Sequence, residues 1–307
     1  MRRINVVCIM SVMLLFLQCK PTEDDVLSED TTMPKVSLSG EVGLPNSRLL
    51  MSKDGVFSWY NVDHLFYYGL YTSRPTRMRS IAMSPHNPNI RIYKCDDIEM
   101  PDYDYINRDL YYIGDFYPTD LSIFRNNHMQ SGKLEDVCNF MLGKMNITAT
   151  KNSDQNYTFP TTQLSMYTSV IHIDFPEEEG AMYYVNYPRC VYQLTITSSG
   201  SMETTPHPDD STKKINTLKC KVVSRSGPIC INGSTKDSYV VVFPQEEPVP
   251  NTVLEVSDGK NRIGTIFFPK GIRSNKLYVA EDGGALQINK RATAVEKDLF
   301  DNSDDLF

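Results

Sequence analysis

Short apolar segments separated by turn residues dominate this sequence and restrict it to a fold built from β-strands. No stretch of about 12 residues or more has the apolar spacing of an amphipathic helix. Residues 36–42 and 191–197 instead alternate between apolar and polar side chains, as a half-buried strand does. Beyond residue 217, short strands recur, residues 239–243 and 276–279 among them, with Gly, Asn, Asp and Pro between them. This pattern is typical of β-sandwiches.

A change of composition at residues 198–217 predicts a domain boundary. Ser, Gly, Pro and Asp replace the apolar residues there, which favours a long loop or a linker. The chain has 307 residues, enough for two domains of ordinary size. We therefore predict a mostly-β protein with two β-sandwich domains of the Greek-key, transthyretin-like type. The N-terminal domain covers residues 35–200 and the C-terminal domain covers residues 201–295.

The N-terminus has the pattern of an export signal. In residues 1–18, Arg2 and Arg3 precede an apolar run. The run is shorter than the roughly 20 residues of a membrane span. The stretch that ends in Gln18 and Cys19 resembles a bacterial lipobox, although Gly, Ala or Ser usually stands where Gln18 does. We predict a signal peptide over residues 1–18 and a lipid-bearing (palmitate-type) Cys19.

Residues 19–34 are polar and acidic and predict a tether after the lipidated cysteine. The cluster at residues 23–25 resembles the signal that directs such lipoproteins to the outer face of the outer membrane. A solvated acidic linker is the alternative interpretation. The expected location is the cell surface, with a lipid anchor in the outer membrane. Residues 296–307 form an acidic tail with two Leu-Phe pairs.

Charge and cysteine content narrow the partners and the chemistry. The net charge of −7 argues against nucleic acid as a partner. Cys220 and Cys230 flank a Ser-Gly-Pro turn signal and could form a disulfide across a hairpin. The alternative, buried thiols, is favoured for Cys138 and Cys190. No CxxC pair occurs, so no zinc site is indicated.

The sequence contains no coherent catalytic motif. Its five histidines are scattered without HxH or HExxH spacing, and no G-x-S-x-G motif occurs. We predict a protein that is not an enzyme and has no catalytic residue, metal or cofactor. The aromatic residues Trp59, Tyr60, Tyr67 and Tyr68 could stack on sugar rings, but core positions in a β-sandwich are the favoured interpretation.

Several segments resemble the fimbrillin family, the fimbrial-subunit lipoproteins of Bacteroides-type bacteria. The segment Phe116-Tyr117-Pro118 resembles the aromatic-Pro element that ends a strand in the N-terminal domain of that family. Residues 169–175 and 194–196 resemble their paired late strands, and residues 240–245 resemble the apolar run followed by Pro-Gln in their second domain. The resemblance is diffuse and covers about residues 36–290.

The resemblance implies a structural or adhesive fimbrial subunit that assembles with other subunits by β-strand exchange. In the family, an arginine-specific protease cuts the loop after the first strand, and a strand of a neighbouring subunit fills the groove. Arg48 lies where such a cut would fall, and an ordinary surface arginine is the alternative. Residues 284–290 are a candidate donor strand. Host or bacterial surface glycans and proteins are further possible partners. The alternative function is an outer-membrane lipoprotein that binds glycans for nutrient capture.

Overall fold

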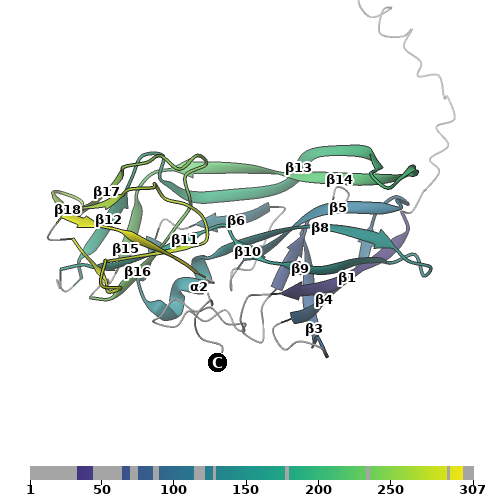
Figure 1. Cartoon of the computed structure of the whole chain (residues 1–307), viewed down its shortest axis with the longest axis horizontal. Helices are drawn as coiled ribbons and strands as arrows, with labels where there is room; N and C mark the ends of the chain where they lie inside the picture. Colours follow the sequence, from purple (N-terminus) through teal and green to yellow (C-terminus); the bar gives the residue numbers. More distant parts are fainter. Residues whose placement is uncertain are drawn as a thin grey trace, which may run out of the picture. The chain divides into compact units, whose positions relative to one another are not determined.

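A computed structural model describes residues 33–43, 64–69, 75–85, 90–113, 122–126, 129–176, 180–232, 236–288 and 291–299. Strands dominate these residues, and their helical elements are a single 3-10 turn, η1 (Leu134–Asp136), followed by α2 (Val137–Phe140). The predicted mostly-β fold is confirmed (Figure 1). Within the same residues, no helix has both the length and the apolar character needed to cross a membrane.

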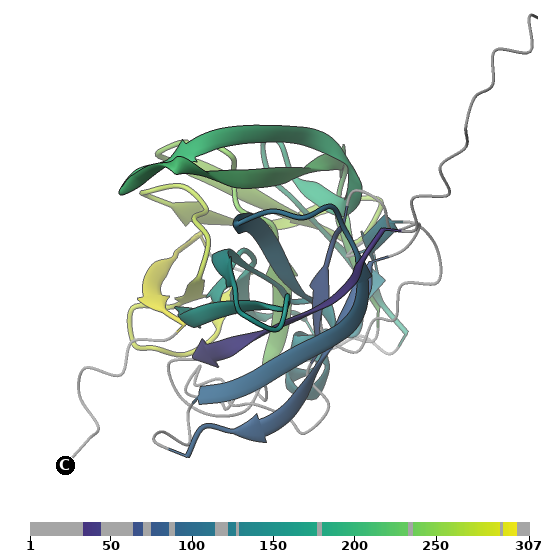
Figure 2. The same ribbon diagram turned by 90° about the vertical axis from the view of Figure 1, so that its right-hand side faces the viewer.

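Seven strands of the largest sheet close into a barrel. Each strand pairs with the next around the ring, and the last pairs with the first. In ring order they are β1 (Lys35–Gly43), β4 (Ile90–Glu99), β3 (Thr76–Met83), β2 (His64–Tyr67), β5 (Tyr105–Ile113), β8 (Leu142–Lys151) and β9 (Tyr157–Gln163). The short β10 (Ser165–Met166) adds to β8. Closure matters because it removes the unpaired edges of an open sheet. Figure 2 shows purple β1 beside the blue strands of this ring.

The alternation of side chains along the barrel strands produces the first core. In β8, Met145, Ile147 and Ala149 are buried, whereas Asn146 and Thr148 between them are exposed. The buried residues join those of the other barrel strands in one apolar cluster. A strand places successive side chains on opposite faces, so the apolar half of each strand fills the barrel.

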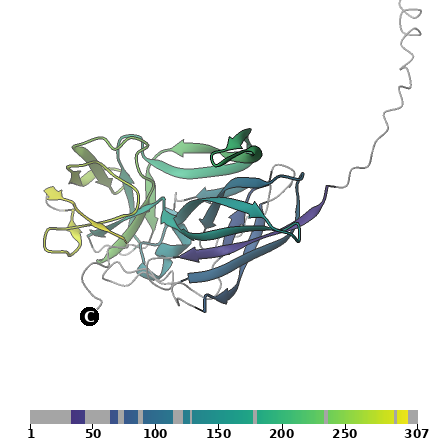
Figure 3. The ribbon, with the colours of Figure 1, turned by 45° about the vertical axis from the view of Figure 1, so that its right-hand side comes forward.

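Two further sheets form a sandwich around a second core. One contains β16 (Ser238–Val242), β11 (Ser169–Asp174), β19 (Lys276–Val279) and β22 (Val295–Asp298), with β20 (Leu286–Gln287) also paired to β11. The other contains β21 (Arg291–Thr293), β18 (Arg262–Phe268), β17 (Thr252–Ser257), β12 (Met182–Asn186), β15 (Ile229–Asn232) and β7 (Met129–Gln130). The later strands, light green and yellow, gather toward one end of the structure (Figure 3).

The β16–β11–β19 sheet is buried on both faces. Val170 and Val241 belong to the first core, whereas Ile171, Val240 and Val242 belong to the second core. This arrangement explains why β11 and β16 are almost continuously apolar, since a strand covered on both faces has no solvent side. The predicted strands at residues 169–175 and 239–243 are therefore confirmed, and the sheet joins the two cores.

Residues 198–217 are not a linker, contrary to the sequence prediction. They lie in β13 (Val191–His207) and β14 (Asp210–Ser226), which form a long antiparallel hairpin. The other edge of β13 pairs with β6 (Ser122–Asn126), and β14 pairs with β5. The segment is rich in Thr and Ser, which suit a solvated strand, and Pro208 lies in the turn at the hairpin tip. Low apolar content was thus a sign of exposure rather than of irregular structure.

The predicted division at residue 200 falls inside the continuous strand β13. From Pro34 onward the described residues belong to one compact unit. The first core draws mainly on residues 36–170 and the second on residues 171–294. The change from one core to the other therefore comes about 30 residues earlier than the composition change. The division into two sandwich domains stays a prediction.

Candidate functional site: the position of the first strand

The first strand, β1, occupies an interior position in the closed barrel. It pairs antiparallel with β4 over its whole length and parallel with β9 from Leu38 to Gly43. The β1–β9 contact is the one parallel pairing in the ring. We call the space that β1 fills between β4 and β9 the first-strand slot. The expected strand at residues 36–42 is confirmed.

Three apolar side chains of β1 point into the first core. Leu38 and Val42 are completely buried, and Val36 is nearly so. Burying a side chain of this size contributes about 1.5–3 kcal/mol. The walls of the slot supply matching apolar surface, because Tyr93 of β4 and Tyr157 of β9 belong to the same cluster. The slot therefore favours a strand with alternating apolar residues.

Gly40 lets β9 approach β1 closely. A Cβ atom on Gly40 would collide with the ring of Phe159, which is itself buried. A side chain at this position would force that ring to move. The irregular register between Gly40 and Val42 lies at the same place. The slot therefore selects for glycine at one point and for apolar side chains on either side of it.

Polar contacts hold both edges of β1. The backbone N–H of Ser37 donates to Oδ1 of Asn156 at 2.9 Å. The hydroxyl of Thr161 donates to a carboxylate oxygen of Glu41 at 2.6 Å. The side chain of Glu41 also accepts a hydrogen bond from the hydroxyl of Ser84 at 3.4 Å. These contacts tie β1 to segments on both sides of the slot.

Cys95 of β4 lies against β1. Its thiol is 4% exposed and donates to the carbonyl oxygen of Leu38 at 3.8 Å. Burial raises the pKa of this thiol to about 12, although the hydrogen bond to Leu38 lowers it. The thiolate is the reactive form of cysteine, so burial against β1 disfavours reaction of Cys95. No motif in the sequence marks Cys95, because only the pairing register of β1 and β4 places it against Leu38.

Several predicted site residues lie outside the described part of the chain. Cys19, Arg48, Trp59 and Tyr60 belong to this group, as does most of the acidic tail. Tyr67 and Tyr68 are described, and each is only 1% exposed. The interpretation of these two tyrosines as core residues is confirmed, and they are not available to stack on sugar rings.

Cys220 and Cys230 do not face each other across a hairpin. Cys220 lies on β14 in the largest sheet, whereas Cys230 lies on β15 and pairs with Tyr184 of β12 in another sheet. Both are free thiols, so the predicted disulfide is wrong. The Ser-Gly-Pro signal between them marks the passage from one sheet to the next. Cys138 and Cys190 are buried free thiols, as predicted.

Asp102 and His172, two titratable side chains away from the slot, have structural partners. Asp102 forms an ion pair with Lys151. The ring of His172 stacks on Tyr239 and lies 3.2 Å from Asp237, and burial lowers the pKa of this histidine. Among the described residues, no three His, Cys, Asp or Glu side chains lie close enough together to hold a metal ion.

No family model and no curated protein matches the chain. Solved structures are similar to it at low identity. A candidate cell adhesion protein from Bacteroides uniformis is 10% identical, with 86% of this chain and 98% of that chain covered and a TM-score of 0.39. The fimbrilin of Porphyromonas gingivalis is 9% identical over 86% of this chain and 97% of that chain, with a TM-score of 0.36.

The tip fimbrial protein Mfa3 of Porphyromonas gingivalis is 10% identical over 86% of this chain and 100% of that chain, with a TM-score of 0.33. Two of these structures are thus fimbrial proteins and one is a candidate cell adhesion protein.

Proposed function

We propose that the chain is a surface-exposed lipoprotein of the fimbrial-subunit type, with a structural or adhesive role and assembly by β-strand exchange. The observation that carries this proposal is the position of β1. A short N-terminal strand fills an interior place in a closed barrel, and Arg48 follows it in the sequence. The lipobox-like stretch before Cys19 supports export and attachment to the outer membrane.

Cleavage after Arg48 would leave β1 bound to the barrel by non-covalent contacts alone. The fragment that leaves would carry both Cys19 and β1, so the lipid would act as a delivery tag. Departure of β1 would open the barrel and expose the backbone N–H and C=O groups of β4 and β9, which require new partners. A strand from a neighbouring subunit would satisfy them and refill the apolar slot.

Part of the candidate donor segment is already packed and paired within its own chain. Leu286 and Ile288 are buried in the second core, and β20 pairs in parallel with β11. Donation of residues 284–290 would therefore require that Leu286 and Ile288 leave this core. In the isolated subunit, the barrel would therefore act as the acceptor, which receives a strand from another subunit.

Treatment with an arginine-specific protease tests the proposal. Cleavage after Arg48 should release the fragment that contains β1 and make Cys95 reactive toward a maleimide. Once β20 of a neighbouring copy leaves its second core and enters the empty slot, higher-order species should appear on size-exclusion chromatography. The Arg48→Gln variant should stay monomeric and keep Cys95 protected. The Cys95→Ser variant identifies the labelled thiol. Loss of β1 without any higher-order species, at any protein concentration tested, would overturn assembly by strand exchange.

A further inference from the structure

The barrel and the long hairpin separate at a fork. Ile215–Leu218 of β14 pair in parallel with Tyr105–Arg108 of β5. Beyond Arg108 the same edge of β5 pairs with β2 instead. β14 continues to Ser226. Beyond Leu218, no described strand pairs with the edge of β14 that faces away from β13. Among the described strands, the segment Lys219–Ser226, called here the free edge, therefore pairs with β13 alone.

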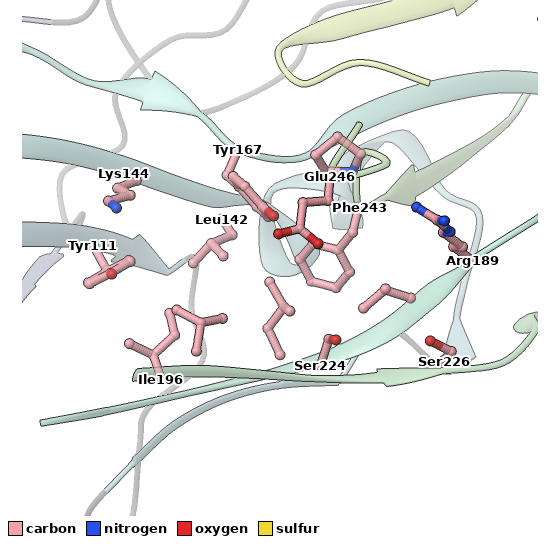
Figure 4. A pocket seen from close by; sticks show the side chains of 14 residues that line it. Tyr111, Leu142, Lys144, Tyr167, Arg189, Ile196, Ser224, Ser226, Phe243 and Glu246 are labelled. Carbon is pink, nitrogen blue, oxygen red and sulfur yellow. The ribbon is translucent and has the colours of Figure 1, made fainter. Parts of the chain in front are cut away.

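A cavity of about 510 Å³ opens beneath the free edge (Figure 4). Its volume lies in the range of ligand pockets. Four of its lining side chains are buried and apolar, and they come from β8, β13 and the segment after β16: Leu142, Leu194, Ile196 and Phe243. The acidic Glu246 also lines the cavity. Lys144 and Arg189 lie at opposite ends of the labelled group in Figure 4. The cavity can accept apolar side chains from a molecule lying along the free edge.

The two faces of the free edge differ in chemistry. Val222, Ser224 and Ser226 line the cavity. Because successive residues of a strand point to opposite faces, Lys219, Lys221, Val223 and Arg225 lie on the outer face. The outer face of the free edge is therefore mainly cationic, and its inner face borders an apolar cavity.

The three cations of the outer face, Lys219, Lys221 and Arg225, have no acidic residue directly opposite them on β13. Their partners on β13 are neutral: Lys219 pairs with Ser201, Lys221 with Thr197 and Arg225 with Gln193. None of these three cations forms an ion pair with the described residues. Acidic residues directly opposite a cation on an adjacent strand stabilise the pairing.

We propose that the free edge binds an extended peptide with alternating acidic and apolar residues. The peptide adds as a strand beside β14, so that its backbone pairs with the unpaired edge. Its apolar side chains enter the cavity next to Val222, and its acidic side chains lie beside Lys219, Lys221 and Arg225. This site is separate from the first-strand slot and requires neither cleavage at Arg48 nor departure of β1.

A pair of synthetic peptides tests the proposal on the uncleaved chain. One peptide has about eight residues, the length of the free edge, with alternating glutamate and valine. The other has lysine in place of every glutamate. Fluorescence anisotropy should show that the acidic peptide binds at least about tenfold more tightly than the lysine peptide. Equal affinities, or no binding of the acidic peptide, would overturn the proposal.

Charge reversal on the outer face provides a matched test. A variant with both Lys221→Glu and Arg225→Glu should lose about tenfold in affinity for the acidic peptide and gain for the lysine peptide. The control Lys260→Glu changes an exposed turn between β17 and β18 and should leave both affinities unchanged. An unchanged preference in the double variant would contradict charge recognition at the free edge.

Hydrogen exchange identifies the mode of binding. Addition of a strand should slow the exchange of backbone amides between Lys219 and Ser226, while the amides of β1 stay as they are. The variant Val222→Asp, at a position that is 49% exposed, should fold normally and abolish binding. Binding of the acidic peptide without slower exchange along β14 would overturn strand addition. In that case the lysines would serve only to keep other strands away.

Discussion

β1 and β14 belong to the same 11-stranded sheet, but β1 is paired along both edges and β14 beyond Leu218 along one. Their residues differ accordingly. β1 turns Val36, Leu38 and Val42 into the barrel and has a glycine where β9 approaches. The last eight residues of β14 are largely exposed and carry three cations.

Two strands of one sheet can therefore differ in how a strand from another molecule could bind beside them. β1 already occupies a site that another strand could take, so exchange there requires displacement. The free edge of β14 is open, so a strand can add without displacing anything. Lys and Arg beside an unpaired edge discourage pairing with most strands. The charge of an added strand therefore determines whether it can bind there.

Truncation of one apolar residue in each strand should give the largest difference. Leu38→Ala should lower the free energy of unfolding by about 2–5 kcal/mol, because Leu38 is completely buried in the barrel. Val222→Ala should change it by about 0.5 kcal/mol or less, since Val222 is half exposed. Chemical denaturation measures both. Similar decreases in the free energy of unfolding would mean that Val222 is as well buried as Leu38, and that the two strands do not differ in burial.

The second test acts at the fork, where β14 is still attached to the barrel. Arg108 is 3% exposed, and its guanidinium donates to Oδ1 of Asn216 at 2.8 Å and to the Asn216 carbonyl oxygen at 2.6 Å. Asn216→Ala should lower the free energy of unfolding by about 1–3 kcal/mol, because it leaves a buried charged donor without its side-chain acceptor.

Hydrogen exchange should then show faster opening of Ile215–Leu218 while β1 stays protected. Thr204→Ala is the matched control, since the Thr204 hydroxyl only accepts a long hydrogen bond of 3.4 Å from Asn216. Faster exchange in β1 as well would indicate that hairpin and barrel open together.

The smallest expected effect is a pH dependence carried by Cys95. The folded-state pKa of its thiol, about 12, lies above the ordinary value of 9.0. Stability is therefore fully present below pH 9 and is lost as the pH rises from 9 toward 12. At pH 10 the loss should be about 1–2 kcal/mol. Cys95→Ala should remove this component of the pH dependence in denaturation experiments at pH 8 and pH 10. An unchanged slope would show that Cys95 is not buried against β1.

Local patterns were enough to predict most strands. Residues 36–42, 169–175 and 276–279 were recognised because alternation or a continuous apolar run has a direct cause in burial on one face or both. Residues 198–217 were misjudged, because their exposed strand has the composition of a loop and owes its structure to pairing within the hairpin. The disulfide was misjudged because a turn signal does not reveal that two strands belong to different sheets.

The sequence by itself determined that this chain is rich in strands, and it predicts an export signal of the lipoprotein type and a resemblance to fimbrial subunits. These properties follow from local spacing and composition. Only the tertiary structure decided that β1 closes a barrel, that Gly40 meets Phe159 and that β14 leaves β5 after Leu218. Strand pairing joins residues more than 100 positions apart, as Leu38 and Tyr157 show, and alternation along one strand does not specify its neighbours.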